Sequence, residues 1–272
     1  MSSTPHLPPV ATIAQKTVVD MLAVGKRVDD RGLNDFREMK LEIGPIERAC
    51  GSALINLGKT KVMVGVKVEE GEPFPDTPDE GVLTVNAELV PLASPSFEPG
   101  PPNENAIELA RVVDRGIRES KAIDLRQLCV QPKRKVFVVF VDVYVLDHDG
   151  NLIDASSIAS LAALLSAKMN EYGVENGEVI YRPELRTLPI QNQPVAVTLA
   201  KIGRSLVVDP SLDEEQVMSA RLTVVSDKDG RICAMQKGGA EALSVEEVKQ
   251  GVAIALSKAP EIRSRIMEAV KT

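Results

Sequence analysis

The stretch that decides the fold is KVFVVFVDVYVL, residues Lys135–Leu146, in which valine and phenylalanine follow one another almost without interruption. Such a run is typical of a strand that is buried on both faces of a sheet. Its one acid, Asp142, must then be paired, hydrogen-bonded or protonated, and we expect it to serve structure rather than chemistry. Asp147–Gly150 turns the chain, and the Ala- and Ser-rich residues 154–171 predict a helix packed closely on this sheet.

The residues before this stretch predict two helices and a set of strands. We expect helices over residues 12–24 and 106–117, the second capped by Asn103 or Asn105. Strands are expected over residues 39–43, 53–57, 62–68 and 82–92. The turn Gly58-Lys59-Thr60 between two of these strands resembles a phosphate-binding loop. That motif requires glycine where this chain has Ala53, so we interpret the turn as an ordinary hairpin.

The residues after this stretch predict a second, similar unit. Three prolines in Tyr181–Pro194 indicate a linker, and strands are expected over residues 195–201, 205–208, 220–225 and 231–235. A capping box at Ser244 opens a helix toward Lys258, and Pro260 either starts a new turn or kinks that helix. Both D-x-D-G turns, at 147–150 and 227–230, lack the spacing of a calcium loop. We therefore predict a two-domain α/β protein: an N-terminal extension and helix over 1–30, domain 1 over 31–180, a linker over 181–194 and domain 2 over 195–272.

Composition excludes several classes of protein. The 272 residues suit two medium-sized domains, and three scattered cysteines with two histidines argue against a disulfide framework or a zinc site. The absence of tryptophan and the presence of only eight other aromatic residues argue against a stacking platform for bases. Residues 1–10 lack the apolar core of a signal peptide, and no stretch could span a membrane. We expect a cytoplasmic protein without a cofactor.

The net charge of −7 is unevenly distributed. Residues 69–88 hold seven acids and no base, whereas residues 101–135 hold eight bases against five acids. Within the second window, Arg111, Arg115 and Arg118 follow at i, i+4 and i+7, which places them within about 60° of one another on a helix. We call these three residues the arginine stripe.

The arginine stripe allows two interpretations. It could be a solvated helix face on which the arginines pair with neighbouring acids, in the pairs Glu108–Arg111, Asp114–Arg118 and Arg115–Glu119. It could instead bind phosphate groups. The pattern alone favours the solvated face.

Two segments closely resemble a known family: FEPGPPNENAIELARVVDR at residues 97–115 and DVYVLD at residues 142–147. The family is RNase PH, and the likeness is greatest to its branch of non-catalytic subunits of the archaeal exosome. GKRVDDR at 25–31, GNLIDA at 150–155 and VDP at 208–210 fit the same branch. The likeness extends from about Gly25 to Lys258.

This resemblance implies an RNase PH-type α+β fold, with two βαβα-like subdomains whose helices pack on mixed sheets. It also implies a ring of three heterodimers, each pairing this chain with a catalytic RNase PH-like paralogue, and RNA-binding cap subunits on that ring. Such a ring degrades single-stranded RNA from its 3′ end with inorganic phosphate.

The residues that carry catalysis in active family members are replaced here. Glu104 and Asn105 stand where an Arg-Arg pair is expected, and no arginine lies between Gly150 and Ser156. Glu215 aligns with the first of two acids six residues apart, but the second position is Arg221. Since phosphoryl transfer depends on positioning and charge stabilisation, we predict a catalytically silent subunit with no catalytic or metal-binding residue.

Within the same branch, Arg111 and Arg115 match arginines that reach RNA, and Arg118 is a weaker match. The resemblance thus reverses the preference drawn from pattern alone and predicts RNA-binding residues Arg111, Arg115 and Arg118. Two rival functions are a self-sufficient phosphorolytic exoribonuclease, which needs the missing acids and arginines, and a protein-only assembly factor, for which the stripe is dispensable.

Overall fold

The computed structural model describes residues 9–175 and 178–271, and its first sheet gathers the strands predicted before residue 150. Its strand order is β1-β2-β3-β6-β4, with β5 paired to β6 beside this path. Strand β4 runs parallel to β6 and the other neighbours are antiparallel, so this sheet is mixed. The strands are β1 (Met39–Ile43), β2 (Gly51–Leu57), β3 (Thr60–Gly71), β4 (Val82–Leu89), β5 (Cys129–Gln131) and β6 (Lys135–Asp147).

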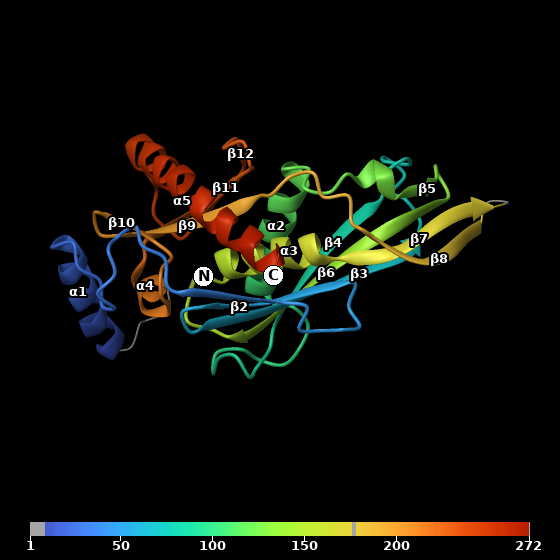
Figure 1. The fold of residues 1–272 in the computed structure, drawn as a ribbon. Helices are drawn as coiled ribbons and strands as arrows, with labels where there is room; N and C mark the ends of the chain where they lie inside the picture. The colour runs from blue at the N-terminus through green and yellow to red at the C-terminus, as the bar shows by residue number, and fades with distance from the viewer. Residues whose placement is uncertain (1–8, 176–177, 272) are drawn as a thin grey trace.

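The second sheet is antiparallel throughout its described strands, in the order β10-β9-β11-β12. It contains β9 (Val195–Ile202), β10 (Ser205–Val208), β11 (Ala220–Ser226) and β12 (Ile232–Gly238). A separate two-stranded ribbon of β7 (Lys168–Glu175) and β8 (Glu178–Thr187) extends at one end of the molecule, and helix α1 (Pro9–Ala23) lies at the opposite end (Figure 1).

Helix α3 lies between the two sheets and contacts β2, β3 and β9. Helix α2 packs on β4 and touches β12, while α5 packs on β9 and β11. The α+β class predicted from the sequence is confirmed. The helices are α1 (Pro9–Ala23), α2 (Glu104–Glu119), α3 (Leu152–Ser166), α4 (Leu212–Val217) and α5 (Val245–Lys271), with a 3-10 turn at η1 (Leu125–Leu128).

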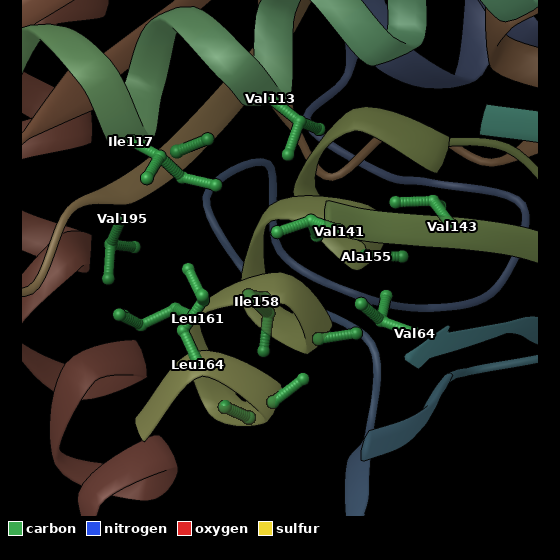
Figure 2. Packing of buried hydrophobic residues seen from close by; sticks show 14 of the residues in the cluster. Val64, Val113, Ile117, Val141, Val143, Ala155, Ile158, Leu161, Leu164 and Val195 are labelled. Carbon is green, nitrogen blue, oxygen red and sulfur yellow. The ribbon is translucent and has the colours of Figure 1, made fainter. Parts of the chain in front are cut away.

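One hydrophobic core joins both sheets through α3. Ile158, Leu161 and Leu164 of this helix are fully buried in the same cluster as Val64, Val143 and Val195 (Figure 2). The lack of a side chain at Gly51 on β2 allows α3 to approach the sheet closely, because a Cβ added there would lie 2.4 Å from the carbonyl oxygen of Ala163. The predicted close packing of this helix is therefore confirmed.

Strand β6 is buried on one face only along most of its length, so the prediction of two buried faces is wrong. Val139, Val141 and Val143 are buried, whereas Phe140 is half-buried and Tyr144 is exposed. The physical reason is coverage: α3 packs against this sheet from one side, and the alternation of side chains sends every second residue to the other side.

Two predicted boundaries are also wrong. The helix expected to reach residue 171 ends at Ser166, because the chain enters β7 at Lys168, whose backbone N–H donates to the Cys50 carbonyl at 2.7 Å. Residues 181–187, predicted as linker, belong to β8, although Pro183 lies among them. These residues form a strand because they pair with β7, and the apolar pattern of residues 181–187 alone does not indicate that pairing.

The final helix begins as predicted. The Ser244 hydroxyl accepts from the Glu247 backbone N–H at 3.1 Å, and the Glu247 carboxylate accepts from the Ser244 backbone N–H at 2.7 Å. These reciprocal bonds are the predicted capping box. The helix then continues through Pro260 to Lys271, so Pro260 does not end it.

Candidate nucleic-acid interface

Helix α2 presents the arginine stripe on its outer face. Asn103 caps the helix by accepting from the Ala106 backbone N–H at 3.0 Å, one of the two caps that the sequence allowed. Leu109, Val113 and Ile117 are buried in the core. Because the stripe lies opposite these residues, the packing of α2 directs its arginines away from the core.

The three arginines differ in what holds them. Arg111 is exposed and forms no hydrogen bond or ion pair among the residues that the structure describes. Arg115 is exposed, and its Nη1 donates to Oε1 of Gln236 on β12 at 3.1 Å. Arg118 forms an ion pair with Asp114 at 2.6 Å. Within the described part of the chain, the stripe therefore offers two exposed guanidinium groups without an acidic partner and one that is already paired.

Arg118 is the least available of the three. The Asp114 carboxylate raises the pKa of Arg118, and the Arg118 guanidinium also donates to the Leu83 carbonyl at 3.0 Å. Of the helix-surface pairs expected from the sequence, Asp114–Arg118 forms. Glu108 instead pairs with Arg221 on β11 at 2.8 Å.

A small pocket of about 190 Å³ opens beside α2 and brings together three positions singled out in the sequence analysis, where Asn105 and Arg221 replace expected residues and Glu215 matches an expected acid. Asn105, Glu215 and Arg221 line it together, whereas Glu104 is exposed elsewhere on the helix and does not. Larger hollows have other linings; one of about 750 Å³ lies beside residues 74–83 and the end of α2.

The chemistry of the small pocket is unsuited to gripping phosphate. Glu215 accepts from the Asn151 backbone N–H at 2.9 Å, and burial raises the pKa of Glu215 despite the opposing charges of Arg221 and Arg37. His148 stacks on Phe97 with ring centroids 5.3 Å apart, and burial lowers its pKa. The guanidinium of Arg221 is bound to a carboxylate, and neutral histidine adds no positive charge.

Sequence reasoning missed a buried charge network that fastens the N-terminal segment to the second half of the chain. Arg27 is 1% exposed, and its Nε donates to Oε1 of Glu214 at 2.8 Å. The same guanidinium donates to the Val208 carbonyl at 2.8 Å and to the Asp209 carbonyl at 2.9 Å. Arg27 is thus paired and hydrogen-bonded, as a buried charge must be.

Asp209 is the centre of this network. Its carboxylate is fully buried and accepts from Arg37 Nη2 at 2.8 Å, Arg31 Nη1 at 3.0 Å and Asn151 Nδ2 at 2.7 Å. Burial alone would lower the pKa of Arg37, but the Asp209 carboxylate outweighs this and raises it. GKRVDDR contains Arg27 and Arg31, VDP contains Asp209 and GNLIDA contains Asn151, although none of these motifs reveals that their residues meet.

Asp154 extends the network into α3. It is fully buried, and its carboxyl accepts from the Thr198 hydroxyl at 2.7 Å and the Thr198 backbone N–H at 2.9 Å. Burial raises the pKa of Asp154 to about 7, against the effect of these donors. This carboxyl therefore changes protonation state near neutral pH.

Asp142 and the D-x-D-G turns have structural roles. Asp142 lies on the half-exposed face of β6 and accepts from Asn86 Nδ2 at 3.2 Å, so its expected burial inside the sheet is wrong and its hydrogen bonding is confirmed. Asp227 accepts from the backbone N–H groups of Asp229 and Arg231, which closes the second turn. Among the described residues, no three His, Cys, Asp or Glu side chains are grouped to hold a metal ion.

No helix within residues 9–175 and 178–271 is both long and apolar enough to span a membrane.

Residues 35–170 match the first domain of the 3′ exoribonuclease family, RNase PH, and residues 192–258 match its second domain. These two matches cover most of both predicted units.

Relatives resemble the chain over nearly its whole length. It is 57% identical over 264 residues to the exosome complex component Rrp42 of Pyrococcus horikoshii, with 96% of both chains covered. It is 46% identical over 254 residues to the protein of that name from Methanothermobacter thermautotrophicus, covering 93% of this chain and 94% of that one.

Chains in two solved exosome structures are similar to this chain in fold as well as in sequence. A chain in the Archaeoglobus fulgidus exosome with RNA bound to the active site superposes with a TM-score of 0.87 at 45% identity, covering 95% of this chain and 99% of that chain. A chain of an archaeal exosome core gives 0.84 at 42% identity, with 95% and 98% covered.

Proposed function

Because the chain belongs to the 3′ exoribonuclease family, RNase PH, we propose that it is a non-catalytic subunit of an archaeal exosome ring and guides RNA through its arginine stripe. In this proposal three copies alternate with three copies of a catalytic RNase PH-like paralogue, and cap subunits that bind RNA sit on the ring. The ring acts in the cytoplasm. The family matches at 35–170 and 192–258 support a division into a first domain that begins near residue 31 and a second over 195–272, with the boundary between them moved beyond the end of β8 at Thr187.

The observation that carries catalytic silence is the pairing inside the small pocket. Arg221, rather than a second carboxylate, lies with Glu215 along its wall and is bound to Glu108 at 2.8 Å. Phosphorolysis requires that inorganic phosphate be held by free positive groups while negative charge develops on the transferred phosphoryl group. A guanidinium already neutralised by a carboxylate neither holds inorganic phosphate nor stabilises that negative charge.

The observation that supports RNA guidance is the exposure of Arg111 and Arg115 on a chain of net charge −7. Arginine binds phosphate oxygens with its planar donors, and such contacts position a strand without reading its sequence. An acidic protein with two exposed arginines on one helix face concentrates RNA contact there, because its acidic surfaces repel the strand elsewhere.

Purification of the chain alone and together with its catalytic paralogue tests the assignment. Native mass spectrometry of the pair is expected to give a ring of three heterodimers. Incubation with single-stranded RNA, inorganic phosphate and a divalent cation is expected to release nucleoside diphosphates from the ring and none from the chain alone.

Three results would contradict the proposal. Nucleoside diphosphate release by the rigorously purified chain would make it a self-sufficient exoribonuclease. A chain that stays monomeric in the presence of the paralogue would contradict the proposed ring of three heterodimers. Crosslinking of RNA that is unaffected by loss of Arg111 and Arg115 would leave a protein-only assembly factor.

A further inference from the structure

Glu108 lies on the same face of α2 as the arginine stripe. It precedes Arg111 by three residues and Arg115 by seven, so its side chain stands within about 60° of both on the helix surface. On a helix without tertiary partners, acids and bases three or four residues apart form ion pairs. Glu108 and Asp114 are each three residues from Arg111, but Asp114 is already paired with Arg118, so Glu108 is the carboxylate placed to neutralise Arg111 in direct competition with RNA phosphate.

The structure draws this carboxylate away from the stripe. Oε1 of Glu108 accepts from Nη2 of Arg221 on β11 at 2.8 Å and from Nε2 of Gln236 on β12 at 3.5 Å. Oε1 of Gln236 in turn accepts from Nη1 of Arg115 at 3.1 Å. Arg221 thus pairs with Glu108, and the uncharged amide of Gln236 lies between Glu108 and Arg115 and hydrogen-bonds to both.

The second sheet is built to accommodate the Arg221 side chain. Arg221 is paired in register with Gly238 on β12, and a Cβ added to Gly238 would lie 3.0 Å from Nη2 and 3.2 Å from Nε of Arg221. The Arg221 side chain is 15% exposed, against 39% for that of Glu108. A partly buried ion pair is less screened by solvent than a pair on the helix surface, so Arg221 outcompetes Arg111 for the carboxylate.

We propose that Arg221 is a positioning residue for RNA binding: it sequesters Glu108 and so leaves Arg111 and Arg115 free to bind phosphate. This inference rests on the proposed role of the stripe. It gives Arg221 a function distinct from that of an RNA ligand, because Arg221 acts through a carboxylate on the neighbouring helix.

The test is a double-mutant cycle in the ring assembled with the catalytic paralogue, with affinity for fluorescein-labelled single-stranded RNA measured by anisotropy over a range of salt. Arg221→Gln frees Glu108, and the loss of about one phosphate contact is expected to flatten the plot of log affinity against log salt by about 0.7 and to weaken binding about fivefold at 0.1 M salt. Glu108→Gln alone is expected to change affinity little, since Glu108 is already sequestered. Glu108→Gln combined with Arg221→Gln is expected to restore both affinity and slope.

Arg231→Gln is the matched control. It removes the same charge from the same sheet at a residue whose side chain is 77% exposed in the β11–β12 turn, and its effect is expected to be independent of residue 108. Thermal unfolding of each ring monitors folding. If Arg221→Gln unfolds at lower temperature, Arg221→Met, which keeps the aliphatic stem, replaces it in the cycle.

The outcomes separate the inference from the function on which it rests. Arg221→Gln without effect on RNA affinity, or a loss that Glu108→Gln does not restore, overturns the inference. If Arg111→Gln with Arg115→Gln also leaves RNA affinity unchanged, the proposed guidance of RNA fails with it. If that pair weakens binding while Arg221→Gln does not, guidance stands and the sequestering role alone is lost.

Discussion

Replacing Arg111 and Arg115 together by glutamine isolates the charge of the stripe from the packing of α2. Both side chains are exposed, and the buried face of the helix is formed by other residues, among them Leu109 and Val113. Glutamine has nearly the helix propensity of arginine, so the helix is expected to persist. The substitution therefore removes two positive charges without opening a cavity.

The expected effect follows from the number of phosphate groups that the two arginines contact. Each contact with a single strand contributes about 0.7 to the slope of log affinity against log salt, so two contacts contribute about 1.4. At 0.1 M salt this corresponds to a loss of about 25-fold in affinity. The loss is expected to be the same for different base sequences, because phosphate contacts carry no sequence information.

Anisotropy of labelled single-stranded RNA on the assembled ring, between about 0.05 and 0.2 M salt, measures both quantities. The control is Lys249→Gln with Arg265→Gln, which removes the same net charge from exposed positions on α5. If the control flattens the slope as much as the stripe variant does, the effect belongs to overall charge. If the stripe variant leaves the slope unaltered, the arginines are a solvated helix face.

Four further predictions follow from individual contacts. Arg118→Gln is expected to flatten the same salt plot by clearly less than about 0.7, because Asp114 already neutralises that guanidinium. Glu215→Gln in the ring is expected to leave the rate of nucleoside diphosphate release unchanged, and a large loss in a folded ring would show that its pocket takes part in catalysis. Asp209→Ala leaves buried arginines without their carboxylate and is expected to lower the free energy of unfolding by about 3–5 kcal/mol in denaturant titrations. Asp154 has a pKa raised from 3.8 to about 7, so its contribution to stability is present below about pH 4 and is lost as the pH rises through 7; the stability of Asp154→Asn, measured relative to the natural chain, should rise across that range.

Local signals predicted the elements that local physics determines. The apolar spacing of α2, its Asn103 cap and the Ser244 capping box each involve residues within a few positions of one another, and the structure contains them all. The hairpin of β2 and β3 is another such case, because Gly58 adopts a positive φ of 59° in the turn that joins them.

The parts that sequence reasoning missed depend on contacts between distant residues. Whether the second face of an apolar strand is buried depends on what packs against it. The composition of β6 does not indicate that its second face is left half-exposed. The ribbon of β7 and β8 contains Pro183, which lowered its apparent strand character.

In the candidate site too, local spacing predicted some features, whereas others depend on contacts between distant residues. Helical spacing placed Arg111 and Arg115 on one face, as observed, but it also predicted that Glu108 would pair with Arg111. That choice is made by Arg221, which follows 113 residues later in the chain. Helix spacing describes which pairs are within reach, and tertiary packing decides which of them form.

The buried arginine network has a consequence for the order in which a newly synthesised chain matures. Arg27 leaves the ribosome 187 residues before its partner Glu214, and Arg37 leaves 172 residues before Asp209. Until those acids emerge, the guanidinium groups of the nascent segment stay in water, beside a ribosome whose RNA is rich in phosphate. The first part of the chain to be made is therefore among the last to settle, and translation must pass Glu214 before the N-terminal segment can leave solvent for its buried place.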